Sequence, residues 1–228
     1  MKKKLLVFDA SSIISLAMNC LLPELRELKL ASENVEFVLT REVHYEVIER
    51  PKKIKRFALE ALKAENLYKE KIFVSPSALG FNEDEISRKT DEILNKSNSI
   101  FSTRKRDVHL IDKGEASCLA FNEMVLKKGF DSVIVVDERT TRLLGENPGN
   151  IEKLMEKKLH MDVKQNKSHN LGFDDFKFVR STELIYYAYK KGLTRLKGKD
   201  ALDAMLWGLK FKGAAISDEE IGELEKLS

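Results

Sequence analysis

The order of apolar and polar residues along the chain predicts short buried strands that alternate with helices. Residues 4–8 end in four consecutive apolar residues before Asp9, and residues 133–136 are apolar up to Asp137. Strands that are apolar at consecutive positions are typical of parallel sheets that helices cover on both faces. Two further stretches of this kind lie at residues 35–39 and 71–74.

Between these strands, apolar spacing and capping residues predict helices. Ser11 and the serine after it offer an N-cap for a helix at residues 13–22 that stops near Pro23. Thr40 is the expected N-cap of the next helix, and Gly129 has the position that follows a helix end. Further helices are expected at residues 53–68, 114–128, 181–192 and 200–212, and in part of 81–103.

This alternation predicts an α/β fold: a three-layer α/β/α doubly wound sheet, mainly parallel, with a helical C-terminal tail. We expect one main domain at residues 1–145. Residues 146–178 show little periodicity and are interpreted as a loop or insertion. Residues 179–228 are interpreted as a helical extension that packs on the same domain.

Composition indicates an intracellular protein. No apolar run approaches the eighteen or so residues of a membrane span, and the lysine-rich start leads into only four apolar residues. We therefore expect neither a signal peptide nor a membrane anchor. Two cysteines, Cys20 and Cys118, are too few for a disulfide framework, so a reduced cytoplasm is the expected location.

Basic residues are clustered although the whole chain is nearly neutral. The formal net charge is only +3, so bulk charge does not identify a nucleic-acid partner. Local clusters are candidates for phosphate contacts, and the alternative is that they are solvated faces. The candidate RNA-binding residues are Lys52, Lys53, Arg56, Arg104 and Arg106.

Four acidic residues occupy positions where different elements converge. Asp9 and Asp137 each follow a predicted strand directly, and Glu115 falls in the first turn of a predicted helix. Glu46 lies beside the apolar stripe of another helix. Because ligands of open parallel sheets bind beyond the carboxyl ends of the strands, we expect the four carboxylates to face one crevice.

Four carboxylates in one crevice repel one another unless a cation neutralises them, and hard oxygen ligands favour Mg²⁺ or Mn²⁺. Such an ion can activate water and stabilise the transition state of phosphodiester hydrolysis. Each acid also has a purely structural interpretation: a helix cap for the aspartates, a partner of the helix dipole for Glu115, and a partner of Arg50 for Glu46.

Other chemistries fit less well. The four histidines lack the spacing of a zinc site. An aspartyl phosphotransferase would place a second Asp two residues after Asp9, where this chain has Ser11, and no Gly-rich phosphate loop is present. The histidines are His44, His109, His160 and His169.

Four segments resemble the motifs of PIN-domain nucleases, in the order of that family. The first is a strand followed by Asp-x-Ser at Asp9 and Ser11, and the second places an acid, here Glu46, three positions after a valine. The segments are residues 5–14, 40–47, 114–120 and 133–139. The resemblance covers about residues 3–145, and the last fifty residues look more loosely like the helical tail of the archaeal and bacterial, VapC-like branch.

The resemblance implies a Mg²⁺- or Mn²⁺-dependent endoribonuclease. It assigns metal binding to Asp9, Glu46, Glu115 and Asp137, and a positioning role for metal or water to Ser11. The fourth motif departs from the family, because many relatives have Thr-x-Asp where this chain has Val135-Val136-Asp137. Glu42 and Glu138 are therefore alternatives to Glu46 and Asp137.

The expected substrate is single-stranded or unpaired RNA, because a recessed acidic pocket admits an extended strand more easily than a duplex. Two roles remain open: the toxin of a toxin-antitoxin pair, with a small antitoxin partner, or RNA maturation with a processing partner. The resemblance also implies a homodimer. A catalytically silent RNA-binding or protein-interaction module with the same fold is the alternative, since catalysis is sensitive to errors of about 1 Å.

Overall fold

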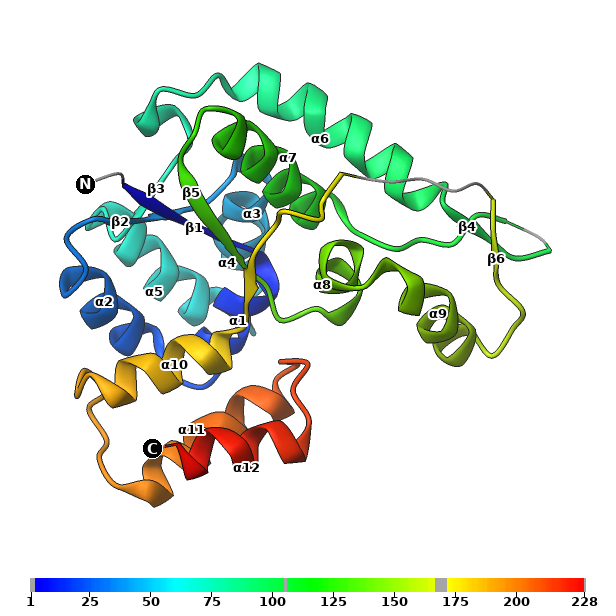
Figure 1. The fold of residues 1–228 in the computed structure, drawn as a ribbon. Helices are drawn as coiled ribbons and strands as arrows, with labels where there is room; N and C mark the ends of the chain where they lie inside the picture. Colours follow the sequence, from blue (N-terminus) through cyan, green and yellow to red (C-terminus); the bar gives the residue numbers. More distant parts are fainter. Residues whose placement is uncertain (1–2, 105, 167–171, 228) are drawn as a thin grey trace.

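A five-stranded parallel sheet forms the centre of the protein (Figure 1). The computed structural model describes residues 3–104, 106–166 and 172–227. The strands have the spatial order β3-β2-β1-β5-β7, and each neighbouring pair is parallel. They are β1 (Lys4–Phe8), β2 (Val35–Val38), β3 (Phe73–Val74), β5 (Asp131–Val135) and β7 (Phe178–Val179).

Register places the ends of β1 and β5 side by side. Phe8 pairs with Val135, and the backbone N–H of Asp9 donates to the Val135 carbonyl at 2.9 Å. The aromatic rings of Phe8, Phe37 and Phe73 pack together, with 5.0 Å between the ring centroids of the first two. The predicted consecutive apolar residues thus fill a core between strands and helices.

Helices cover both faces of the sheet, so the predicted three-layer α/β/α architecture is confirmed (Figure 1). On one side α6 (Glu83–Asn98) packs on α7 (Lys113–Lys127). The other side is formed by α1 (Ala10–Met18), α2 (Leu22–Leu30), α5 (Ala58–Lys69) and α10 (Ser181–Lys190).

The first helix differs from its prediction at both ends. Asp9, and neither serine after it, is the N-cap of α1, because its carboxylate accepts the N–H of Ser11. The helix ends at Met18, before a tight turn in which Cys20 has a φ of 59°. Pro23 lies in the first turn of α2, where its missing N–H costs nothing, so it begins a helix instead of stopping one.

The second predicted helix contains an irregular turn. Thr40 caps α3 (Arg41–His44) as predicted, accepting the N–H of Val43. The chain continues as the π-helix η1 (Tyr45–Glu49) and the short α4 (Arg50–Lys52). A π-helix has one extra residue in its turn and changes the direction in which side chains point.

Residues 146–178 include more order than a loop. They contain η3 (Pro148–Asn150), α9 (Ile151–Leu159) and β6 (Lys164–Gln165), which pairs with β4 (Phe101–Ser102) as an antiparallel two-stranded sheet. Ile151 and Met155 bury one face of α9. Of the two predicted interpretations, loop or insertion, these elements fit an insertion.

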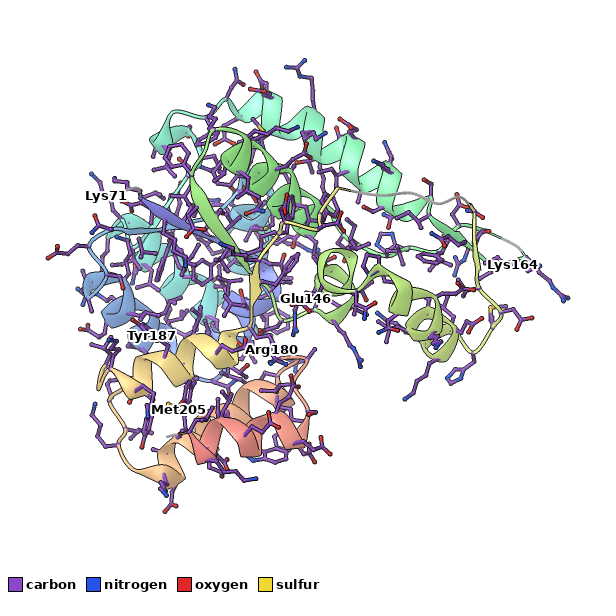
Figure 2. All side chains as sticks on the ribbon, viewed as in Figure 1. Lys71, Glu146, Lys164, Arg180, Tyr187 and Met205 are labelled. Carbon is purple, nitrogen blue, oxygen red and sulfur yellow. The ribbon has the colours of Figure 1, made fainter. Side chains whose placement is uncertain are left out.

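The C-terminal part joins the main core. β7 pairs with β5, and α10 contacts α1 and α2. Met205 of α11 (Lys199–Phe211) belongs to the same apolar core, whereas Leu202 and Leu206 pack with α12 (Asp218–Lys226) in a smaller cluster (Figure 2). No helix in the described ranges combines the length and apolar character needed to cross a bilayer.

Candidate active site

Asp9 stands where β1 ends and α1 begins. Its Oδ2 accepts hydrogen bonds from the N–H of Ser11 at 3.0 Å and from the Ser11 hydroxyl at 2.6 Å. Its Oδ1 is buried and meets no hydrogen-bond donor in the described part of the chain. Burial raises the pKa of Asp9, although the bonds from Ser11 oppose that shift. One carboxylate oxygen is therefore left for a cation.

Ser11 connects the ends of the two central strands. While its hydroxyl donates to Asp9, its Oγ accepts the backbone N–H of Asp137 at 3.1 Å. The hydroxyl thus fixes the start of the segment after β5 relative to the carboxylate after β1. The contact positions the Asp9 carboxylate and the start of the segment at Asp137, while the predicted role of Ser11 toward metal or water stays a prediction.

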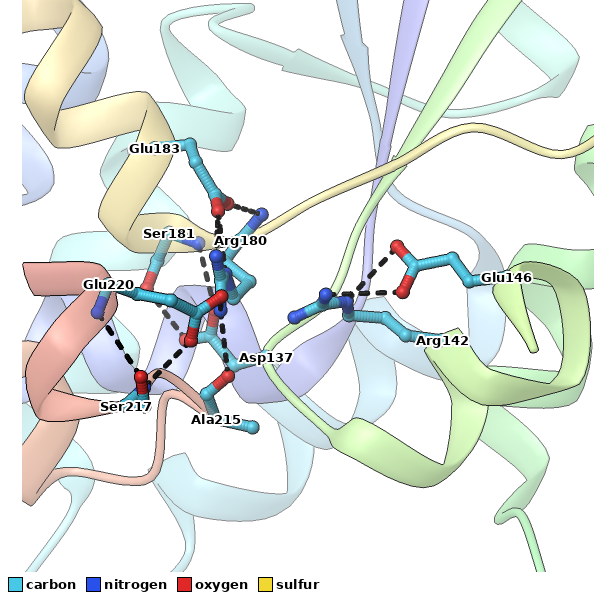
Figure 3. Close-up of polar contacts among 9 residues, drawn as sticks. All are labelled: Asp137, Arg142, Glu146, Arg180, Ser181, Glu183, Ala215, Ser217 and Glu220. Carbon is cyan, nitrogen blue, oxygen red and sulfur yellow. Dashed lines mark hydrogen bonds and ion pairs between the residues drawn. The ribbon is translucent and has the colours of Figure 1, made fainter. Parts of the chain in front are cut away.

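Asp137 is only 1% exposed, and both its oxygens accept hydrogen bonds from one residue. Ser181, at the start of α10, donates its N–H to Oδ1 at 2.8 Å and its hydroxyl to Oδ2 at 2.7 Å (Figure 3). Burial raises the pKa of Asp137, and the bonds from Ser181 lower it. Asp137 therefore anchors the start of α10 to the end of the central sheet.

Glu115 lies at the start of α7 as the N3 residue of a capping box. Its Oε2 accepts the N–H of Asp112 at 2.7 Å, and its Oε1 accepts the hydroxyl of Thr141 at 2.6 Å. Burial, followed by the negative charge of Asp9, raises the pKa of Glu115 to about 8. The structural and the functional interpretation of Glu115 are thus compatible.

Glu46 comes from the π-helix and lies against the start of α7. A Cβ atom at Gly114 would be 2.8 Å from its Oε2, so a larger residue there would displace the carboxylate from this position. Burial raises the pKa of Glu46 to about 7, with further contributions from the charges of Asp9 and Asp112. The π-helix and Gly114 together place this acid beside the others.

The two alternative acids have different surroundings. Glu42 forms an ion pair with Lys113 at 3.8 Å. Glu138 caps α8 (Arg139–Glu146), accepting the N–H of Thr140 at 2.7 Å, and its charge raises the pKa values of Asp9 and Glu115. Glu138 therefore faces the acidic group, and it is a stronger alternative than Glu42.

The donor set fits Mg²⁺ or Mn²⁺ in chemistry, because it consists of carboxylate oxygens and includes the free Oδ1 of Asp9. The described part of the chain contains no group of three or more acidic, histidine or cysteine side chains whose present positions could hold a metal ion. Glu115 and Asp137 are both turned toward protein donors. Coordination by Glu115 or Asp137 would thus compete with these hydrogen bonds.

The candidate RNA-binding residues lie in two places. Lys52 forms an ion pair with Glu65 at 2.7 Å, and the guanidinium of Arg56 lies 5.4 Å from the ring centroid of Phe57. With Lys53, they follow the π-helix that carries Glu46. Arg104 and Arg106 instead belong to the turn after β4, in the lobe with β6 and α9 (Figure 1).

Sequence reasoning missed three partners of the acids: Thr141, Ser181 and Gly114. Thr141 was detectable in part, since it lies one helical turn after Asp137. Ser181 contacts Asp137 from 44 positions away, and no local pattern indicates that contact. Comparisons with family models, curated proteins and solved structures found no match to this chain.

Proposed function

We propose that this protein is a metal-dependent ribonuclease. The observation that carries the proposal is a set of buried acids around Asp9: burial raises the pKa values of Glu46, Glu115 and Asp137, and the charge of Asp9 raises each of them further. Carboxylates that interact in this way gather at sites that bind cations or move protons. The free Oδ1 of Asp9 supports the same conclusion.

In this proposal the residues have distinct roles. Asp9, Glu46 and Glu115 hold Mg²⁺ or Mn²⁺, with Asp137 or Glu138 as the fourth acid, while Ser11 and Thr141 orient the carboxylates. The bound ion would supply an activated water and a counter-charge for the phosphodiester. Arg50 and Lys53, near Glu46 in sequence, are suited to hold the phosphates of a single strand.

A toxin role, an RNA-maturation role and a homodimer remain proposals. The toxin role predicts a small bound antitoxin on purification from the native cell. The second candidate function is a catalytically silent RNA-binding or protein-interaction module. It is favoured by one observation, the orientation of Glu115 and Asp137 toward protein donors. Titration with Mn²⁺ separates the two functions, because a silent module would not bind the ion at millimolar concentration.

The test is cleavage of labelled single-stranded RNA with Mn²⁺. We expect the natural protein to cleave, and Asp9→Asn or EDTA to reduce the rate on the order of 100-fold, because a bound cation provides several kcal/mol of charge stabilisation. Glu42→Gln is the matched control and should retain activity, since Glu42 pairs with Lys113 outside the acidic group. Equal rates for Asp9→Asn and the natural protein would refute the proposal.

Mn²⁺ titration and thermal unfolding of two variants identify the fourth acid. Glu138→Gln should lower Mn²⁺ affinity if Glu138 is the ligand, with a smaller loss of stability than Asp137→Asn because its amide oxygen can still cap α8. Asp137→Asn removes an acceptor from Ser181 and should lower the unfolding temperature as well.

A further inference from the structure

Two buried hydroxyl groups join the helix that leads to Glu46 to the helix against which Glu46 lies. Thr40 and Ser117 are both fully buried, and their hydroxyl oxygens are 2.6 Å apart. Thr40 is the N-cap of α3, which continues into the π-helix of Glu46, whereas Ser117 lies near the start of α7. The contact therefore connects two segments that are 77 positions apart in the sequence.

The direction of these hydrogen bonds follows from the number of hydroxyl protons. The Ser117 hydroxyl donates its single proton to the Gly114 carbonyl at 2.6 Å, so Thr40 is the donor in the bond between the two hydroxyls. Thr40 Oγ1 in turn accepts the N–H of Val43 at 3.4 Å. A chain of bonds thus runs from the first turn of α3 to the backbone of Gly114, and both hydroxyl protons have an acceptor.

Glu46 closes this chain of bonds into a ring. Gly114 is the second residue of α7, where a helix offers a backbone N–H no acceptor of its own. The carboxylate of Glu46 accepts this N–H, and it lies so near that a Cβ at Gly114 would be 2.8 Å from Oε2. Glu46 is therefore tied to α7 through its side chain and, by way of Thr40 and Ser117, through the helix that precedes it.

Each hydroxyl also has a use within its own helix. Thr40 caps α3, and a serine in a helix commonly bonds a carbonyl one turn before it, as Ser117 does. Neither use requires the two hydroxyls to touch. The bond between them therefore serves the joint between α3 and α7, and Gly114, at the end of this bond, is the residue that also holds Glu46.

We propose that Thr40 and Ser117 are positioning residues that hold Glu46 on the amide of Gly114, and thus in the acidic group. The inference rests on the proposed function for its consequence in the active site, where a displaced Glu46 would bind Mn²⁺ less tightly. The position of the Glu46 carboxylate on Gly114 can be tested without any metal.

The first experiment measures amide hydrogen exchange by NMR in EDTA. We expect Thr40→Val and Ser117→Ala to speed exchange at Gly114 about 10-fold, the change expected for the loss of one hydrogen bond. Thr40→Ser keeps the hydroxyl and should exchange like the natural protein. Ile134, whose N–H donates to the Lys177 carbonyl at 2.9 Å, reports on opening of the central sheet and should change less.

The second experiment measures Mn²⁺ affinity, with Thr90→Val as the matched control. Thr90 is also fully buried, and its hydroxyl bonds the Ile86 carbonyl of its own helix at 2.8 Å. We expect Thr40→Val and Ser117→Ala to weaken Mn²⁺ binding about 10-fold, as the loss of a group that orients a metal ligand does. Thr40→Ser and Thr90→Val should bind like the natural protein. Unfolding temperatures of all variants establish that they are folded.

Each outcome decides a separate point. Unchanged exchange at Gly114 in Thr40→Val and Ser117→Ala, with Mn²⁺-dependent cleavage intact, would overturn the inference and leave the nuclease standing. Equal acceleration at Gly114 and Ile134 would also overturn it, because it would show a general loss of stability. Faster exchange at Gly114 alone, together with a natural protein that neither binds Mn²⁺ nor cleaves RNA, would support the positioning of Glu46 and refute the nuclease.

Discussion

Gly114 shows how one residue without a side chain can determine the position of an acid. Its backbone lies under the carboxylate of Glu46, and a Cβ would be 2.8 Å from Oε2 and 3.0 Å from Oε1. The carboxylate is the far end of a flexible side chain, so it can yield to an added methyl group only by leaving this position. Alanine at residue 114 would thus move the acid, while the helix itself would be stabilised by alanine.

We predict that Gly114→Ala lowers the Mn²⁺-dependent cleavage rate between about 10- and 100-fold, because a displacement of about 1 Å at a reacting site has effects of this order. The unfolding temperature should change little. Gly222→Ala is the control, since Gly222 also lies in a helix and has no atom within 4 Å of the added Cβ. Unchanged kinetics in Gly114→Ala would contradict the placement of Glu46.

At the scale of elements, the sequence predicted the strands and helices that have a local apolar pattern. It missed the elements that form only through contacts with distant parts of the chain. The strands β1 and β5 were predictable because consecutive apolar residues end at an aspartate in each. The two-residue strand β7 has no such signal, because its pairing with β5 is formed by the tertiary structure. The π-helix was also missed, since an extra residue in a turn leaves the sequence looking like an ordinary helix.

One prediction concerns the link between α10 and α12. Arg180 is 8% exposed and donates to the Ala215 carbonyl at 3.0 Å and to Glu220 at 2.9 Å (Figures 2 and 3). Arg180→Met should lower the free energy of unfolding by about 2 kcal/mol, because buried hydrogen bonds to charged groups are lost. Fluorescence of Trp207, the only tryptophan, should report early opening of α11 and α12 in urea.

The matched control is Arg26→Met. Arg26 bonds Glu70 at 2.7 Å, but its side chain is 42% exposed. Exposed ion pairs contribute about 0–1 kcal/mol, so this variant should unfold almost as the natural protein does. Equal losses in the two variants would show that the Arg180 contacts do not hold the C-terminal helices.

At the scale of the whole molecule, the site should make stability depend on pH. The pKa values of Glu115 and Glu46 are raised to about 8 and about 7, against 4.5 for free glutamate. Between pH 4.5 and these raised pKa values, the two glutamates of the folded protein keep protons that the unfolded chain releases. Their contribution to stability is therefore complete below pH 4.5 and is lost as the pH rises toward 8.

In EDTA, we expect the free energy of unfolding to fall between about pH 5.5 and pH 8, by at most about 1.4 kcal/mol per pH unit for each group. Urea unfolding at several pH values in this range measures the free energy of unfolding. Glu115→Gln should flatten the curve, and Mn²⁺ should bind more tightly as the pH rises because binding displaces protons. A curve for the natural protein as flat as that of Glu115→Gln would contradict the raised pKa values.

The hydrogen bonds from Ser181 to Asp137 also order events during synthesis. Asp137 is held in part by a serine that follows it by 44 positions, and its carbonyl accepts a bond from the still later Ala215. A nascent chain thus lacks these contacts until Ser181 and Ala215 have left the ribosome. On the proposed function, this delay would spare the messenger and the ribosomal RNA nearest to the growing enzyme.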